Sequence, residues 1–558
     1  MTSRLPRRTS TDRRQVLRIL HAASATVLAL VLTAGPTAPR AAARQNGPPK
    51  LVVILVVDQM RADYLTWYAA NYSKGLARLT REGAWFTEAA YPYLNTITCA
   101  GHSTIGTGTF PYRHGMILNN WFDPKTGKSP YCTDDPTVTE ISYNHLSPVQ
   151  GDSAKRLLVP AIGEQIMKRG GRSVAFSLKP RSAVPLTGHK ATAVAWFDDR
   201  GGWTTSTAFT KEPVPFLQAF IDANPLTGDY DKVWERSLPP AQYQGEDDGK
   251  GEGKVAGWST TFPHPLAVPG GKADADYYGR WQRSPYADAY LGRMAAAAVD
   301  ALKLGQGATT DFLGVSFSAV DAVGHVYGPR SHEIQDLLVR LDGTIGTLLD
   351  HLDRTVGKGR YILGFSADHG VSEIPEQTGG GRVSSKAVSA ALDKVLVPAL
   401  GPGTHVLSAT YTNIYLDAAA RKRLEKDAAL RESALTALRS VQGVGASFWG
   451  KDLESAGARA SSDPVRRAAA LSHSPGRSGD IIIAPAEKWL MSTAVTTHGS
   501  QYAYDQRVPV IFFGGEVRAG RYGDPATPAD VMPTLAAVAK VKVEKTDGRS
   551  LAAVIEVE

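Results

Sequence analysis

The chain has 558 residues, 43% of them hydrophobic and 21% charged, which is the composition of a globular protein with a large core. Its formal net charge is +8, but residues 1–43 hold seven arginines, no lysine and one acidic residue, and so account for +6. The remaining +2 is not the basic footprint of a nucleic-acid-binding protein, and we expect no nucleic-acid partner.

Residues 1–43 predict an export signal. An arginine-rich start precedes an apolar stretch, 22–34, that is too short to span a bilayer, and small residues at 41–43 suit a cleavage site. Segment 12–18, with two adjacent arginines, resembles a twin-arginine signal, and an arginine-rich Sec signal is the alternative. No later run is apolar enough to cross a membrane. We therefore expect export machinery to act on the leader and the mature chain, 44–558, to be periplasmic or secreted.

Runs of β-branched and aromatic residues predict strands, with helical patterns between them. The predicted strands are 51–57, 173–178, 191–197, 312–320, 361–365, 481–484 and 508–513. The clearest helical pattern spans Glu333 to Leu352, with leucines and isoleucines on one face. This alternation predicts an α/β fold, a mostly parallel central sheet covered by helices on both faces.

Three stretches interrupt this pattern. Residues 213–286 are rich in Trp, Tyr, Pro and Gly and predict a cap over the substrate. Their aromatic side chains could stack on an aromatic leaving group, but more often such residues form the core of the insertion itself. Residues 378–382 are glycine-rich and predict a loop, and residues 410–478 predict a second, helical insertion.

Candidate metal ligands and one hydroxyl nucleophile follow in an order that suits phosphoryl transfer. They are Asp58, Thr98, Asp321, His325, Asp368, His369 and His498. Asp58, Asp321 and Asp368 each lie at or just beyond the end of a predicted strand. Open α/β sheets gather their ligands at the carboxyl ends of the strands. Zinc takes His nitrogens and Asp oxygens in open catalytic sites, and two ions roughly 4 Å apart suit phosphate-ester hydrolysis. The sequence therefore predicts two Zn²⁺ per chain.

Cys99 and Cys132 are the two cysteines of the chain. They form no Cys-x-x-Cys motif, so a metal would be held by His and carboxylate ligands. After export the pair could form a disulfide. Cys99 also lies beside Thr98 and could itself be a nucleophile, but a buried structural cysteine is the commoner case.

The ordered motifs resemble those of the alkaline phosphatase superfamily, in particular its nucleotide pyrophosphatase/phosphodiesterase-like branch. The motifs are Asp58, Thr98-x-x-Gly101-His102, Asp321-x-x-x-His325, Asp368-His369-Gly370, His498-Gly499 and the segment 530–535. The resemblance implies that Asp321, His325 and His498 hold one zinc, and that Asp58, Asp368, His369 and Thr98 Oγ hold the other. It further implies that Thr98 attacks the phosphorus and that Asn119 donates to a phosphoryl oxygen.

A pair of cations decides between two branches of this superfamily. Lys179 and Arg181 follow a predicted strand and resemble the Lys-x-Arg pair of the phosphate-irrepressible (PafA-type) alkaline phosphatases. Two cations suit the dianion of a phosphate monoester, because its charge exceeds that of a diester. In isolation, two exposed basic residues after a strand would be the commoner interpretation.

These observations predict a two-zinc alkaline phosphatase that hydrolyses small phosphate monoesters through a phosphothreonine intermediate. The first alternative is a phosphodiesterase or nucleotide pyrophosphatase that uses the same site with an apolar pocket. The second is a non-catalytic phosphoryl-binding protein, which would be expected to have lost a ligand or the nucleophile. None of them is missing here.

Overall fold

The structure is a computed structural model that describes residues 1–2, 47–255 and 257–555. The predicted leader, 1–43, therefore lies almost entirely outside the described residues. The chain divides into two units, Met1–Gly47 and Pro48–Glu558, and every element named below belongs to the second. None of the described helices is long and apolar enough to cross a bilayer.

An 11-stranded sheet forms the centre of the second unit, with the strand order β19-β2-β18-β11-β1-β10-β5-β6-β7-β3-β4. The strands are β1 (Leu51–Val57), β2 (Ala84–Phe86), β3 (Asp134–Ser142), β4 (Gln150–Asp152), β5 (Ser173–Ser177), β6 (Ala193–Asp198), β7 (Gly202–Ser206), β10 (Asp311–Phe317), β11 (Tyr361–Ser366), β18 (Val510–Gly514) and β19 (Gly520–Tyr522). The five central strands β11, β1, β10, β5 and β6 run parallel, and antiparallel strands flank them on both sides. The predicted fold class is confirmed.

Strand β1 is buried on both faces, as its uninterrupted apolar sequence predicts. Alternate residues enter two different hydrophobic clusters, because successive side chains of a strand point to opposite faces. Leu51, Val53 and Leu55 pack with α3 (Gly75–Glu82), α10 (Pro285–Leu302) and α12 (His332–Leu352). Val52 and Ile54 pack with α4 (Thr98–Thr107), α6 (Ile162–Met167), α7 (Pro180–Thr187) and α20 (Val531–Val538). The sheet is thus covered by helices on both faces.

Helix α12 matches the predicted helix of residues 333–352 within one residue. It begins at a Ser331 cap, whose hydroxyl accepts the N–H of Ile334. The leucines and isoleucines of the pattern are buried against the sheet. The predicted strand of residues 312–320 is shorter in the structure, because α11 (Ala319–Tyr327) begins two residues after β10 ends.

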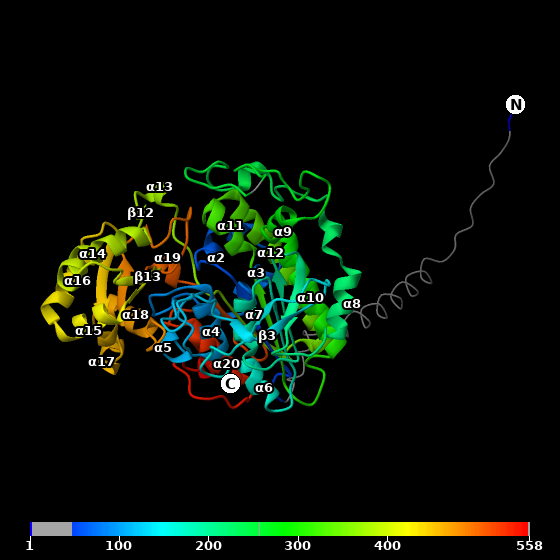
Figure 1. Ribbon diagram of the computed structural model, residues 1–558. Coiled ribbons are helices and arrows are strands. Elements are labelled where there is room, and N and C mark those ends of the chain that lie inside the picture. The colour runs from blue at the N-terminus through cyan, green and yellow to red at the C-terminus, as the bar shows by residue number, and fades with distance from the viewer. Residues whose placement is uncertain (3–46, 256, 556–558) are drawn as a thin grey trace. The chain divides into compact units, whose positions relative to one another are not determined.

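A second, four-stranded antiparallel sheet differs from the prediction. Its order is β13-β14-β16-β15, formed by β13 (Val406–Thr410), β14 (Asn413–Leu416), β15 (Val444–Trp449) and β16 (Ile481–Pro485). The predicted strand of residues 481–484 therefore belongs to this sheet and not to the parallel one. Its apolar run indicated burial, but such a run does not identify the partner strand. Helices α14 (Ser385–Leu400), α15 (Ala418–Lys426) and α16 (Ala428–Arg439) pack on it, and Figure 1 shows them together on one side.

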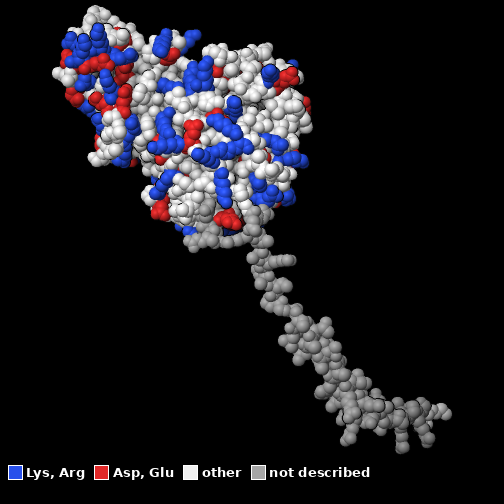
Figure 2. Space-filling model, turned by 90° about the horizontal axis from the view of Figure 1, so that it is seen from below, with Lys and Arg blue, Asp and Glu red and all other residues white. Residues whose placement is uncertain are grey.

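The expected loop at 378–382 and the expected cap at 213–286 both contain regular structure. Segment 378–382 includes β12 (Gly381–Arg382), which pairs with β17 (Trp489–Leu490). The stretch 213–286 includes α8 (Pro215–Ala223) and α9 (Ala275–Gln282), and its Trp234 and Trp281 are fully buried. These tryptophans thus form part of a core. On the face drawn in Figure 2, basic side chains are scattered and acidic side chains lie among them.

Candidate two-metal active site

The carboxyl ends of four neighbouring strands deliver most of the predicted site. Asp58 follows β1, Asp368 follows β11, and Lys179 lies two residues after β5. Asp321 follows β10 in the first turn of α11. The order of these strands in the sheet is β11-β1-β10-β5, so the four side chains start from one edge.

The first candidate metal group is formed by Asp321, His325 and His498. Asp321 and His325 are one turn apart on α11, which places both side chains on one face of the helix. His325 Nε2 lies 3.1 Å and His498 Nε2 lies 3.8 Å from Asp321 Oδ1. One ligand atom from each residue lies within 4.8 Å of the other two.

The second candidate group is formed by Asp58, Asp368 and His369, all fully buried. His369 Nε2 lies 3.5 Å from Asp58 Oδ1 and 3.2 Å from Asp368 Oδ2. The two groups adjoin, because the rings of His369 and His498 stack with their centroids 3.4 Å apart. The six ligands predicted from the sequence thus come together as two sets of three.

A backbone carbonyl orients each of the three imidazole rings. His325 Nδ1 donates to Thr496 O at 3.0 Å, and His498 Nδ1 donates to Thr96 O at 2.7 Å. His369 Nδ1 donates to Gly370 O at 2.9 Å. Each ring therefore presents Nε2 to its group, the arrangement in which a protein fixes a metal-binding histidine.

Thr98 is the first residue of α4 and is 1% exposed. Its hydroxyl lies 3.3 Å from His369 Nε2, beside the second group. The first-turn N–H groups of a helix have no partner inside the helix, so an anion bound at Thr98 would meet partial positive charge. The glycine of the Thr-x-x-Gly motif has a steric cause. A Cβ on Gly101 would lie 2.1 Å from the carbonyl oxygen of Asp368, so glycine allows α4 to approach that residue.

The three remaining candidate residues surround these groups in different ways. Asn119 is half-buried, and its Oδ1 accepts the N–H of Cys99 at 2.9 Å. Lys179 Nζ donates to Asp58 Oδ2 at 2.6 Å and also to Asp321 Oδ2, so it bridges the two groups. Arg181 lies in the first turn of α7 and makes no hydrogen bond or ion pair with any residue that the structure describes. Its guanidinium is therefore available to a ligand.

The close packing of three carboxylates shifts the acid–base equilibria of the site. Burial, followed by Asp321 and Asp368, raises the pKa of Asp58 to about 7. Burial opposes protonation of His369, but Asp368 outweighs it, and the pKa of His369 rises to about 9. Burial, His369 and His325 hold the pKa of His498 well below its usual range. A cation bound between these groups would therefore displace protons.

The donor set fits divalent metal ions. Asp58 Oδ1 is buried and accepts no hydrogen bond from any residue within the described ranges. Each set offers a mixture of imidazole nitrogen and carboxylate oxygen, which zinc accepts and other first-row divalent ions also tolerate. The fully buried carboxylates would be costly in the absence of compensating positive charge.

Two further residues support the groups, although the sequence analysis assigned them no role there. Gln59 donates from Nε2 to Asp321 Oδ1 at 2.7 Å and from its backbone N–H to Asp368 Oδ1 at 3.1 Å. It therefore joins the two sets. The sequence signal that could have identified Gln59 is its position directly after Asp58, the aspartate at the end of a predicted strand. His102, the last residue of the Thr98-x-x-Gly101-His102 motif, lies 3.2 Å from Asp368 Oδ2 through Nδ1 and donates to Thr98 O at 2.9 Å.

Comparison with known proteins agrees with this geometry. A model of the type I phosphodiesterase / nucleotide pyrophosphatase family matches residues 52–505. The alkaline phosphatase PhoV of Synechococcus elongatus is 32% identical over 508 residues, which cover 88% of this chain and 90% of PhoV. The alkaline phosphatase PafA of Elizabethkingia meningoseptica is 31% identical over 510 residues, which cover 88% and 92% of the two chains.

The crystal structure of wild-type PafA has the same fold. It matches with a TM-score of 0.82 at 29% identity and covers 91% of this chain and 99% of that one. The family model spans most of the chain, and PhoV and PafA match it over nearly their whole lengths. The chain therefore belongs to the type I phosphodiesterase/nucleotide pyrophosphatase family of the alkaline phosphatase superfamily, alongside the PafA-type alkaline phosphatases.

Proposed function

We propose that this protein is a two-zinc alkaline phosphatase that hydrolyses phosphate monoesters through a phosphothreonine intermediate. The observation that carries the proposal is the position of the Thr98 hydroxyl, at a helix N-terminus and beside two adjoining sets of three metal-type ligands. The alkaline phosphatases that match nine-tenths of the chain identify it as a phosphoric monoester hydrolase. Asp321, His325 and His498 would hold one zinc.

Asp58, Asp368, His369 and the Thr98 hydroxyl would hold the other zinc. When bound, the ions supply positive charge that lowers the pKa of the attacking hydroxyl and stabilises the leaving oxygen. Thr98 Oγ attacks phosphorus, an Oγ–P bond forms, and the bond from phosphorus to the leaving alkoxide breaks. Water then attacks the phosphothreonine, the Oγ–P bond breaks, and inorganic phosphate leaves. The first-turn amides of α4 favour the negative charge throughout.

Asn119 is oriented for phosphoryl binding. Because its Oδ1 accepts the N–H of Cys99, the residue beside Thr98, its amide lies close to the nucleophile. Its Nδ2 makes no hydrogen bond to any residue that the structure describes. We therefore assign Nδ2 as a donor to a phosphoryl oxygen.

Lys179 and Arg181 would bind the remaining phosphoryl oxygens. Lys179 reaches the centre of the site, where Asp321 and then Asp58 hold its pKa above the usual range against the effect of burial. It therefore stays charged at alkaline pH. The Arg181 side chain makes no hydrogen bond or ion pair within the described ranges, although its charge acts on Asp152, and it can offer two parallel N–H donors to a dianion.

A comparison of monoester and diester hydrolysis tests this assignment. The purified, zinc-bound chain is assayed with p-nitrophenyl phosphate and with bis-p-nitrophenyl phosphate. We expect a Lys179→Ala/Arg181→Ala variant to lose about 10²- to 10⁴-fold in monoester kcat/KM, on the scale of two charge-assisted hydrogen bonds, and much less with the diester. The matched control is Lys168→Ala/Lys190→Ala, which removes two exposed cations that flank the pair in the sequence.

Other outcomes would favour the other candidates. The family model favours a second function, phosphodiester hydrolysis at the same site. A diester preference in the parent chain, or equal losses on both substrates, would support that function and contradict the monoester assignment. No turnover of either substrate with zinc bound would support a phosphoryl-binding protein.

The proposal includes an arrangement of the whole chain. Residues 1–43 would be an export signal that directs a periplasmic or secreted enzyme. Residues 44–558 would form the catalytic domain, into which 213–286 are inserted as a cap and 410–478 as a second insertion. The second sheet supports an inserted unit around 410–478, and its flanking elements α14 and β16 lie outside those bounds.

A further inference from the structure

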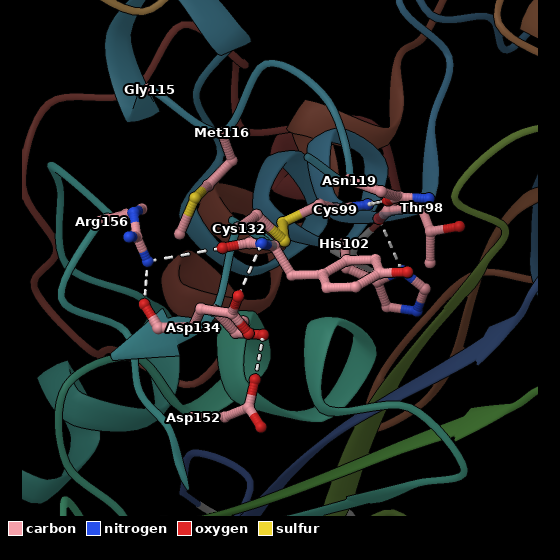
Figure 3. Close-up of a disulfide and its surroundings, with 12 residues drawn as sticks. Thr98, Cys99, His102, Gly115, Met116, Asn119, Cys132, Asp134, Asp152 and Arg156 are labelled. Atoms are coloured by element: carbon pink, nitrogen blue, oxygen red, sulfur yellow. Dashed lines mark hydrogen bonds between the residues drawn. A yellow bond between two sulfur atoms is a disulfide. The ribbon is translucent and has the colours of Figure 1, made fainter. Parts of the chain in front are cut away.

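A disulfide joins the nucleophile helix to a distant segment. Cys99, the second residue of α4, is bonded to Cys132, 33 residues further along the chain, and both cysteines are fully buried. The pairing left open by the sequence is therefore made, and Cys99 is not a free thiol. Figure 3 shows the disulfide beside Thr98 and Asn119.

Both half-cystines also bind Asn119 through their backbone. The N–H of Cys99 donates to the side-chain Oδ1 of Asn119 at 2.9 Å. The N–H of Cys132 donates to the backbone carbonyl of Asn119 at 2.7 Å. The disulfide and these two hydrogen bonds form a closed ring of contacts. Asn119 thus cannot move away from Thr98 unless a hydrogen bond breaks or Cys132 moves with it.

The segment that carries Cys132 is itself anchored. The Asp134 carboxylate accepts the N–H of Tyr131 at 2.8 Å, and Arg156 donates to the backbone carbonyl of Asp134. Thr133 Oγ1 donates to Asp152 Oδ1 at 2.6 Å (Figure 3). In contrast, residues 124–129, between Asn119 and Cys132, are exposed. The disulfide, together with the β-bridge between Asn120 and Tyr131, therefore couples Asn119 to the anchored segment that carries Cys132.

We propose that the Cys99–Cys132 disulfide is a positioning element of the reaction, which holds the Asn119 amide at a set distance from Thr98 Oγ. The inference rests on the proposed function, because it takes Asn119 as a phosphoryl donor. A disulfide that acted only as a staple would stabilise the fold without any link to Asn119. The two roles differ in whether the effects of the cystine and of Asn119 on catalysis are additive.

A double-mutant cycle separates these roles. Four zinc-bound proteins are compared: the parent chain, Asn119→Ala, Cys99→Ala/Cys132→Ala, and the triple variant. The kcat and KM for p-nitrophenyl phosphate and the inhibition constant of inorganic phosphate are measured well below each melting temperature. We expect Asn119→Ala to lower kcat/KM by about 10- to 100-fold, and the cysteine variant to lose a similar amount. The triple variant should then lose little beyond Asn119→Ala alone.

A control variant distinguishes positioning from loss of stability. Ile105→Ala removes buried side-chain volume from α4 seven residues beyond Thr98, so it should lower the melting temperature while its kinetic effect adds to that of Asn119→Ala. If Cys99→Ala/Cys132→Ala does not fold, Cys99→Val/Cys132→Ala replaces part of the lost volume and takes its place in the cycle.

Two outcomes would overturn the inference in different ways. Additive losses in the triple variant, or parent-like kcat/KM in the folded cysteine variant, would reduce the disulfide to a staple while the proposed function stands. A parent chain that binds zinc but turns over no monoester would overturn the proposed function and, with it, the positioning role.

Discussion

At the residue scale, ligand identity and ligand orientation have different origins. His325 and His498 could be named from the sequence because each lies in a short motif with an aspartate or glycine. Their orientation depends on the carbonyls of Thr496 and Thr96, which accept Nδ1–H and leave Nε2 for the metal. Thr496 is 171 residues from His325, so this contact could not be read locally.

Gln59 gives a prediction at this scale. Its side chain holds Asp321, whereas its backbone N–H holds Asp368. Gln59→Ala should therefore weaken zinc binding by the Asp321 group about 10- to 100-fold and leave the Asp368 group nearly unchanged. Chelator titration with measurement of bound zinc should show one ion lost early and one retained.

A buried glutamine elsewhere serves as the control for Gln59. Gln165→Ala removes a side chain that accepts from Glu544 N, far from both groups in the sequence, and should leave both ions bound. Loss of both ions together in Gln59→Ala, or of neither, would contradict the separate roles of its side chain and backbone.

At the element scale, the start of α12 carries a buried acid that contacts the segment 213–286. Glu333 is fully buried, and its Oε1 lies 2.8 Å from His264 Nε2. Its Oε2 has no hydrogen-bond partner within the described ranges. Burial, with a further contribution from Asp247 and against the effect of Arg236, raises the pKa of Glu333 to about 8. The folded chain therefore favours the protonated acid.

This pKa predicts a pH dependence of stability. The pKa of Glu333 in the folded chain exceeds the unfolded value near 4.3. Its contribution to the free energy of unfolding is therefore fully present below about pH 4.3 and is lost as pH rises through about 8. The loss is about 1.4 kcal/mol per pH unit across that window. Glu333→Gln should remove this pH-dependent loss. The free energy of unfolding of the variant, measured in urea, should therefore rise relative to that of the parent chain between pH 5 and pH 9.

The control for Glu333 is Glu235, an exposed glutamate of the segment 213–286. Glu235→Gln should follow the pH dependence of the parent chain, because its carboxylate is solvated in both states. Parallel stability curves for Glu333→Gln and the parent chain would show that Glu333 ionises in the folded protein as it does in the unfolded chain.

At the scale of the whole molecule, the metal groups join separate parts of the chain. Asp58, Asp321 and Asp368 lie just beyond the carboxyl ends of three strands of the central sheet, and His498 comes from a loop far along the sequence. Ions that bind the folded chain alone stabilise it by mass action. We expect chelation to abolish hydrolysis, to lower the melting temperature, and to be reversed by added zinc.

A single substitution makes this prediction sharper. Asp58 has a pKa of about 7 because burial and two neighbouring carboxylates disfavour its charge. Without metal, Asp58→Asn should therefore melt no lower than the parent chain at pH 8, and with zinc it should melt lower because a ligand is lost. Calorimetry on both proteins, with and without chelator, provides the measurement. A metal-free Asp58→Asn that melts well below the metal-free parent would contradict the charge argument.

Much of the fold could be predicted because periodicity and apolar runs are local signals. The continuous run at residues 51–57 predicted a buried parallel strand, and residues 333–352 predicted one helix. Pairing is not local. The equally apolar run at residues 481–484 joined the antiparallel sheet through β14 and β15, because its neighbours in space and not its composition select its partners.

The sequence by itself determined the fold class and the order in which the metal-type ligands and Thr98 follow one another, since parallel strands bring their carboxyl ends to one edge wherever they lie in the chain. The tertiary structure decided the Cys99–Cys132 pairing, the bridge made by Gln59 and the direction of each imidazole. These features depend on distances between segments that are far apart in the chain. Such distances are fixed only when the sheet, the helices and the second sheet have packed together.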